Sequence, residues 1–188
     1  MTKAEVRAAK LAQRNALNAT MRREYSLAIA EHLWAQPEYI RSSAIHVYLP
    51  IRGEVDTQPI IERAWQENKH VLVPLVVQGD SDLRHSYYCP GMTLIPGIYS
   101  IPQPASPELL DNDALLALAP LVLVPVVAFD QHLHRLGYGK GYYDRFLTQL
   151  SFVRFGLAYA FQYGDFPTDE HDVPLDAVIT ELGIARRW

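Results

Sequence analysis

The segment of this chain best suited to chemistry is GYGKGYYDRF, from Gly137 to Phe146. Its glycines alternate with Tyr138 and Lys140, and each glycine adds backbone entropy and no packing side chain to a helix or strand. We interpret the segment as a loop whose bare N–H groups cradle an anion, with the Lys140 charge where phosphate oxygens would lie. The alternative is a tight connection with a purely structural role. The next acidic residue, Asp144, either caps the following helix or holds a Mg²⁺ ion at those oxygens.

Two common phosphate-binding patterns do not fit this loop. The dinucleotide fingerprint GxGxxG fails because the position of its third glycine is Tyr142. The Walker A pattern fails because Gly139 and Lys140 are followed by Gly141, which has no hydroxyl group for a metal, and no glycine lies five residues before Gly139. The anion cradle is therefore predicted from physical chemistry and not from either pattern.

A basic stripe follows the N-terminal segment TKAEVRAAKLAQRNAL, where Lys3, Arg7, Lys10 and Arg14 recur every three or four residues. This spacing predicts an amphipathic helix. Up to Arg23 the chain has six basic residues and one acidic residue, although its net charge is −4. One interpretation of the stripe is a solvated helix face, and the other is a surface that meets an anionic ligand.

The elements that must position these residues alternate between helix and strand. Thr20 and Thr57 are candidate helix caps, and the run LVLVPVVAF at 121–129 is typical of a strand buried on both faces. Strand, helix and strand over 44–77 predict a parallel βαβ unit. The predicted helices span 2–17, 20–34, 57–68 and 142–150, and the predicted strands span 44–50, 70–77, 83–88, 121–129, 153–159 and 177–180.

This alternation predicts a single-domain, three-layer α/β fold over residues 1–188, with a mainly parallel central sheet and helices on both faces. The glycine loop then lies between the strand ending at Phe129 and the helix starting near Tyr142. Ligands of open α/β sheets bind beyond the carboxyl ends of the strands. The loop is therefore expected at the ligand-binding edge of the sheet.

Composition narrows the class of protein. Hydrophobic residues at 49% and charged residues at 20% are typical of a folded globular chain and argue against disorder. The longest uncharged run, 114–129, contains two prolines and is shorter than the roughly 20 apolar residues that a membrane span needs. The single cysteine, Cys89, forms neither an internal disulfide nor a zinc site by itself. With no apolar leader segment visible, we expect a cytoplasmic protein that contacts no membrane.

The glycine loop also supports a more specific resemblance. The stretch RLGYGKGYYDRFL, at 135–147, resembles the signature of the 5-formyltetrahydrofolate cyclo-ligase family, also called 5,10-methenyltetrahydrofolate synthetase. Further segments agree in order along nearly the whole chain: the KxxxR of Lys3 and Arg7, YLPIRGEVDTQPII at 48–61, GIYSIPQP at 97–104, LVPVVAFD at 123–130, FGLAYAFQ at 155–162 and EHDVPLDAVIT at 170–180.

The resemblance implies ATP- and Mg²⁺-dependent closure of 5-formyltetrahydrofolate to 5,10-methenyltetrahydrofolate through a phosphorylated formyl group, with release of ADP and phosphate. It implies catalytic roles for Lys140, Arg135 and Tyr143. The implied ATP-binding residues are Lys3, Arg7, Arg135, Leu136, Gly137, Tyr138, Gly139, Lys140, Gly141, Tyr142 and Tyr143. The implied folate-binding residues are Leu49, Glu54, Tyr138, Gly139, Lys140, Gly141 and Tyr142, and the implied Mg²⁺ ligands are Asp144 and Asp172.

Several alternatives stay open at this stage. Glu54 either accepts hydrogen bonds from the pterin, takes the proton of N10, or is merely a turn residue after a strand. One of Tyr142 and Tyr143 is expected to stack on a ring while the other packs inward. Tyr138 stands where some family members have arginine, and His134 stands where asparagine is common.

Two other functions compete with the cyclo-ligase interpretation. One is a relative that keeps the nucleotide loop and has another substrate. The other is an RNA-binding module that uses the basic helix, although the chain has no recognised RNA-binding motif and is acidic overall. We expect no nucleic-acid partner, and a monomer or a weak homodimer.

Overall fold

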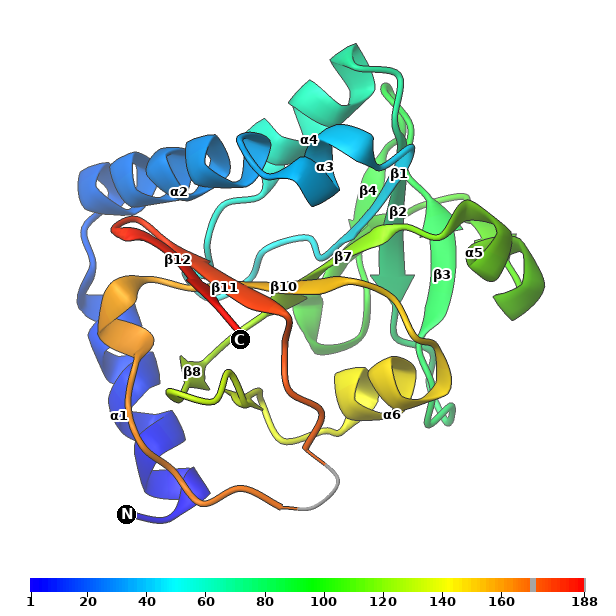
Figure 1. The fold of residues 1–188 in the computed structure, drawn as a ribbon. Coiled ribbons are helices and arrows are strands. Elements are labelled where there is room, and N and C mark those ends of the chain that lie inside the picture. Colours follow the sequence, from blue (N-terminus) through cyan, green and yellow to red (C-terminus); the bar gives the residue numbers. More distant parts are fainter. Residues whose placement is uncertain (170–171, 188) are drawn as a thin grey trace.

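The computed structural model describes residues 1–169 and 172–187, and its centre is an eight-stranded sheet in the order β12-β11-β10-β7-β1-β2-β3-β6 (Figure 1). The five central strands are parallel, and the strands at both edges are antiparallel. The predicted mainly parallel sheet and the parallel pairing of 44–47 with 70–75 are therefore confirmed. The strands are β1 (Ala44–Val47), β2 (His70–Leu75), β3 (Arg84–Tyr87), β6 (Glu108–Leu110), β7 (Leu121–Pro125), β10 (Arg154–Leu157), β11 (Ala177–Thr180) and β12 (Gly183–Arg186).

Helices cover both faces of this sheet, as predicted (Figure 1). One face packs against α2 (Ala19–Trp34), α3 (Pro37–Arg41) and α4 (Gln58–Gln66), and the other packs against α5 (Asn112–Leu118) and α6 (Tyr142–Gln149). Strand β7 shows the two sides, because Leu121 and Leu123 join the first core while Val122 and Val124 join the second. Each such fully buried side chain stabilises the fold by about 1.5–3 kcal/mol.

The helix starts differ in detail from the sequence prediction. The N-terminal helix α1 (Lys3–Ala16) begins with a capping box between Thr2 and Glu5. The cap of α2 is Asn18, whose side chain accepts a hydrogen bond from the Met21 N–H, so the proposed cap Thr20 is wrong. Thr57 does precede α4, but its hydroxyl donates to the Tyr48 carbonyl at 2.8 Å and does not cap the helix.

The predicted strand at 121–129 is two elements. Strand β7 ends at Pro125, and β8 (Ala128–Phe129) leaves the main sheet to pair with β9 (Arg135–Leu136). Proline has no N–H to donate to a ladder, which is consistent with the end of β7 at this residue. The sequence also missed α3, α5, β6, β12, a β4–β5 hairpin (Leu94–Pro96 and Pro102–Pro104) and the 3₁₀ turns η1 (Ile98–Ser100) and η2 (Ala160–Gln162).

The sheet has one topological switch point, between β1 and β7. From β1 the chain continues through α4 to β2 on one side, and from β7 it continues through α6 to β10 on the other side. The loops that leave the carboxyl ends of β1 and β7 therefore diverge at this point, which is where open α/β sheets bind ligands. In the described part of the chain, no helix has the length and apolar character needed to cross a bilayer.

Candidate active site

The glycine loop lies at the switch point, between β9 and α6. Gly139 and Gly141 have φ angles of +84° and +73°, which L-residues with a side chain adopt at a cost. A Cβ atom on Gly139 would lie 3.2 Å from the guanidinium of Arg7, whose Nε donates to the Gly137 carbonyl at 2.8 Å. The bare backbone is therefore needed both for the turn and because an arginine of α1 lies against it.

Lys140 extends from the outside of this loop. Lys140 is exposed, and its ammonium group lies 5.3 Å from the centre of the Tyr99 ring. Tyr99 and Ser100 are consecutive residues with positive φ (58° and 61°), in the turn of the β4–β5 hairpin. The hairpin turn and the glycine loop thus face each other, with the lysine between them.

The basic stripe of α1 is bound to the rest of the protein. Arg7 contacts the glycine loop, Lys3 pairs with Asp172 at 2.7 Å, and Lys10 donates to two backbone carbonyls of the η2 segment at 2.6 and 2.8 Å. Arg14 is 1% exposed and donates to three separate segments. The solvated-face interpretation of these four residues is therefore wrong.

Two ion pairs hold the expected metal ligands. Arg135, which is 6% exposed, donates from Nη1 to the Asp144 Oδ1 at 2.8 Å, and Lys3 holds Asp172. Burial lowers the pKa of Arg135, and the nearby charges of Asp144 and Asp172 act in the opposite direction. Burial alone would raise the pKa of Asp172, but the hydrogen bond from Lys3 brings it below its ordinary value. Both carboxylates therefore interact with the same buried guanidinium.

Glu54 is a buried carboxylate in the loop between β1 and α4. It is 6% exposed, and its Oε2 accepts a hydrogen bond from the Ile51 N–H at 2.9 Å. Burial raises the pKa of Glu54, and the Ile51 N–H and the Arg14 charge partly offset that rise. Burial, followed by the Glu54 charge, raises the pKa of Tyr138 to about 12. The loop after β1 and the glycine loop therefore meet at a shared polar centre.

The paired tyrosines differ in their surroundings. The Tyr143 hydroxyl is buried and has no hydrogen-bond partner among the described residues, and Arg135 lies 5.8 Å from its ring centre. Burial and then the Glu54 charge raise the pKa of Tyr143. Tyr142 instead has the Arg145 guanidinium 5.3 Å from its ring centre. The Tyr143 hydroxyl and the Arg135 Nε are therefore two buried donors that have no hydrogen-bond partner among the described residues.

Comparison with known proteins identifies the family of this chain. The model of the 5-formyltetrahydrofolate cyclo-ligase family matches residues 1–181. This chain belongs to that family. The 5-formyltetrahydrofolate cyclo-ligase of Escherichia coli K12 is 32% identical over 175 residues, which cover 89% of this chain and 94% of that protein. The cyclo-ligase of Mus musculus is 30% identical over 184 residues, 92% of this chain and 91% of its own.

Solved structures of methenyltetrahydrofolate synthetases share the fold. The NMR structure of the 5,10-methenyltetrahydrofolate synthetase of Aquifex aeolicus superimposes with a TM-score of 0.83 at 32% identity, covering 99% of this chain and 93% of that one. The synthetase of Mycoplasma pneumoniae superimposes with a TM-score of 0.78 at 28% identity, covering 96% and 99%. The chain is thus a cyclo-ligase-family enzyme with an α/β fold.

The structure brings most of the cyclo-ligase residues expected from the sequence into one neighbourhood. Direct contacts or nearby charges link Arg7 to the glycine loop, Tyr138 and Tyr143 to Glu54, and Lys3 to Asp172. Leu49 and Leu136 are buried in the core at 6% and 4% exposure. Sequence reasoning placed Arg14 in the stripe without a role and did not single out Tyr99. Within the quoted segment 170–180, Glu170 and His171 lie outside the described residues.

Mg²⁺ fits this cyclo-ligase site only together with other ligands. In the described ranges, no three His, Cys, Asp or Glu side chains gather into a metal-binding cluster. Asp144 and Asp172 also each form an ion pair with a basic side chain, Arg135 and Lys3 respectively. Mg²⁺ in nucleotide sites is held by one or two carboxylates plus phosphates and water. The two carboxylates therefore fit an ion that arrives with a polyphosphate better than an ion bound by the protein alone.

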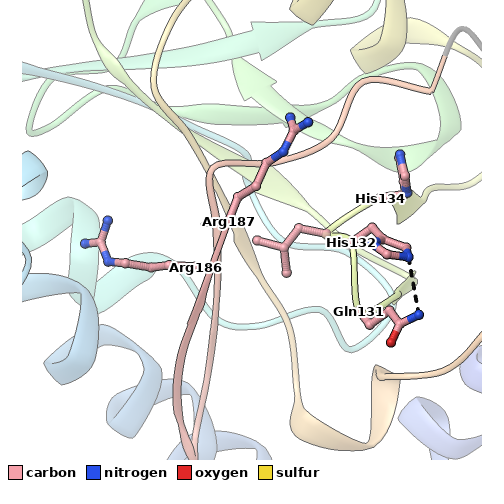
Figure 2. A pocket seen from close by; sticks show the side chains of 6 residues that line it. Gln131, His132, His134, Arg186 and Arg187 are labelled. Carbon is pink, nitrogen blue, oxygen red and sulfur yellow. Dashed lines mark hydrogen bonds between the residues drawn. The ribbon is translucent and has the colours of Figure 1, made fainter.

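A separate pocket of about 380 Å³ lies between the β8–β9 loop and the end of β12 (Figure 2). Its side chains do not converge on one point. Arg186 extends away from His132 and pairs with Glu38 at 2.8 Å, and His134 pairs with Asp130 at 3.1 Å. The pocket therefore lacks converging polar groups of the kind that meet between Glu54 and the glycine loop.

Proposed function

We propose that this chain closes 5-formyltetrahydrofolate to 5,10-methenyltetrahydrofolate with ATP and Mg²⁺, releasing ADP and phosphate. The observation that supports this most directly is the meeting of the glycine loop with the buried carboxylate of Glu54 at one switch point. The first feature suits a polyphosphate, and the second suits the N–H donors of a pterin. The reaction itself is inferred from membership of the cyclo-ligase family.

The proposed reaction needs charge neutralisation more than proton transfer. An N-formyl carbonyl is a weak electrophile with no leaving group. Attack of its oxygen on the γ-phosphorus of ATP expels ADP and leaves a phosphorylated formyl group. The N10 amine then attacks the same carbon, N10 loses its proton, and phosphate departs with the C–O bonding electrons to leave the methenyl cation. The attacking formyl oxygen has no proton to lose, so the phosphoryl step requires no general base.

The glycine loop and its neighbours are proposed to bind the phosphates. Gly137, Tyr138, Gly139, Lys140 and Gly141 line the cradle, and the Lys140 ammonium turns from Tyr99 toward the transferred phosphoryl group. Positively charged donors at such a position stabilise the transition state by about 3 kcal/mol each. The flanking ATP-binding residues in this proposal are Lys3, Arg7, Arg135, Leu136, Tyr142 and Tyr143.

Arg135 and Tyr143 are proposed to act on the reacting groups. Both present buried donors without partners in the described chain, at the Arg135 Nε and the Tyr143 hydroxyl. Such donors, fixed before the substrate binds, cost little reorganisation when negative charge develops. The two therefore complete the catalytic set with Lys140.

Asp144 and Asp172 are the proposed Mg²⁺ ligands. When bound, the ion supplies charge neutralisation between the phosphates. For these carboxylates to reach it, Arg135 and Lys3 must transfer part of their hydrogen bonding from the carboxylates to phosphate oxygens. Glu54, with Leu49 beside the same loop, is proposed to hold the pterin, or to accept the N10 proton.

The experiment that tests this function mixes the purified chain with ATP, Mg²⁺ and 5-formyltetrahydrofolate and follows the near-ultraviolet absorbance of the methenyl product. Omission of each component is the control. We expect product only when all three are present. A flat trace from folded protein that binds ATP would reject the folate reaction and favour another acceptor on the same nucleotide loop.

One variant of Glu54 and one solution measurement refine the proposal. Loss of folate binding alone in Glu54→Gln would assign pterin binding to this residue, whereas loss of turnover at unchanged binding would assign proton transfer.

We further propose that residues 1–188 act as one cytoplasmic domain without a nucleic-acid or membrane partner, as a monomer or weak homodimer. Light scattering of the purified protein tests the last point.

A further inference from the structure

Arg14 has the largest fully buried side chain among the described residues. It lies in the last turn of α1 and is 1% exposed. Its Nε donates to the Arg52 carbonyl at 3.2 Å, its Nη1 donates to the Val126 carbonyl at 3.4 Å, and its Nη2 donates to the Tyr138 hydroxyl. One guanidinium therefore joins three segments that are far apart in the sequence.

These three segments meet at the switch point of the sheet. Arg52 belongs to the loop after β1, Val126 follows β7, and Tyr138 belongs to the glycine loop. A planar guanidinium presents its donors in a fixed fork, so it sets the relative positions of its acceptors as well as binding them. Removing the fork would take a donor from all three segments, although the Val126 carbonyl would keep its hydrogen bond from the Gln162 Nε2 at 2.6 Å.

The turn held by Arg14 carries backbone strain. Arg52 and Gly53 have consecutive positive φ angles of 49° and 74°, and Glu54 follows them directly. A residue with a side chain in this conformation costs about 1–2 kcal/mol. The bond from the Arg14 Nε to the Arg52 carbonyl helps to offset this cost. The position of Glu54 thus depends on a contact made from another element.

The charge of Arg14 also acts on Glu54. Of the two arginines whose charge acts on this carboxylate, Arg52 is exposed and Arg14 is buried. Solvent screens the exposed charge strongly and the buried one weakly. The Tyr138 hydroxyl interacts with both Arg14 and Glu54, and the Arg14 guanidinium carbon lies 5.6 Å from the Tyr138 ring centre. Arg14, Tyr138 and Glu54 therefore form one connected polar unit.

We propose that Arg14 is a positioning residue for the cyclo-ligase reaction, acting through Glu54 and Tyr138. It fixes the glycine loop against the turn that carries Glu54, and it keeps the Glu54 carboxylate in its charged, hydrogen-bond-accepting form. The inference rests on the proposed function. It concerns a residue that does not itself touch the substrate.

The test compares Arg14→Met and Arg14→Lys with the wild type and with a matched control, Lys10→Met. Lys10 belongs to the same stripe and also docks α1, but through the carbonyls of Phe161 and Tyr163, away from Glu54. The readouts are thermal stability, kcat and KM for each substrate, and kcat/KM for 5-formyltetrahydrofolate between pH 5 and 8.

Loss of the Arg14 charge is expected to move the acid limb of the folate kcat/KM profile upward by about one pH unit in Arg14→Met, because a protonated Glu54 no longer accepts the donors of the pterin. Arg14→Lys keeps the positive charge and loses the forked set of donors. The acid limb of the profile is therefore expected to stay at its wild-type pH, while the KM for 5-formyltetrahydrofolate rises about tenfold. The control variant, Lys10→Met, is expected to lose thermal stability without a shift in the acid limb of the kcat/KM profile.

If Arg14→Met does not fold, the Arg14→Lys variant decides. Arg14→Lys with wild-type kinetics, or Arg14→Met with the same profile as Lys10→Met, would overturn the inference and leave the proposed function intact. A wild-type protein that forms no methenyl product would instead overturn the proposed function, and this inference with it.

Discussion

A buried histidine pair predicts how the stability of this protein depends on pH. The His46 Nε2 and the His85 Nδ1 lie 3.0 Å apart on β1 and β3, and the two residues are 0% and 3% exposed. The ring of Phe146, on α6, packs on both imidazoles with centroid separations of 5.0 and 4.7 Å. Because α6 begins at the glycine loop, this pair lies in the layer that supports the site.

The direction of the effect follows from the pKa shifts. Burial, and then the Arg84 charge, lowers the pKa of His85 from 6.5 to about 4. Burial, and then the His85 charge, lowers the pKa of His46 well below 6.5. The unfolded chain therefore takes up protons at a higher pH than the folded chain. The free energy of unfolding therefore has its full value above pH 6.5, where both histidines are neutral in the folded and the unfolded chain. It falls as the pH drops from 6.5 toward 4.

The magnitude follows from linkage. A histidine that is protonated only in the unfolded chain lowers the free energy of unfolding by about 1.4 kcal/mol per pH unit below 6.5. Between pH 7 and pH 5, His85 alone is therefore expected to lower it by about 2 kcal/mol, and the pair by up to about 4 kcal/mol. This is a large fraction of the roughly 5–15 kcal/mol that stabilises a typical domain.

The assay is urea unfolding at several pH values between 7.5 and 5, with a reference variant in which His46 and His85 are both replaced by leucine. Removing both partners together leaves no unpaired imidazole, and the carboxylates common to both proteins cancel in the comparison. We expect the wild type to lose at least about 2 kcal/mol more than the variant from pH 7 to pH 5. Parallel stability curves for the two proteins would refute this reasoning.

Three further predictions concern single residues. Lys140→Ala is expected to lower turnover by at least about a hundredfold with unchanged thermal stability, because the residue is exposed and its proposed role is in the transition state; near-normal steady-state turnover would remove it from the catalytic set. Gly139→Ala is expected to cost about 1–2 kcal/mol in urea unfolding and to weaken ATP binding measured by calorimetry, since its φ is +84°; unchanged affinity would show that the loop geometry is not required. Gly156→Ala is expected to cost about 1–3 kcal/mol, because the new Cβ would lie 2.6 Å from Leu175 Cδ1 in the core; an unchanged unfolding midpoint would show that the core adjusts freely.

Local signals in the sequence predicted the regular elements around the site. The helical spacing of α1, the turn-rich glycine segment and the strand–helix–strand pattern over β1, α4 and β2 are each visible within about 35 residues. The switch-point position of the glycine loop followed from these elements. The split of 121–129 was missed because Val126 to Phe129 are as apolar and as buried as β7, and only the partner strand distinguishes the two segments.

The sequence by itself determined the family, the parallel α/β architecture and the residue types of the site, because periodicity and motif spacing are local properties of the chain. The tertiary structure alone decided which partner each side chain meets. Lys3 pairs with Asp172 across 169 residues, and Arg14 reaches Tyr138 across 124. Such contacts depend on how elements pack in space, and a helix periodicity gives no information about which carbonyl or carboxylate faces it. The buried role of Arg14 therefore becomes visible only when the three segments it joins are folded together.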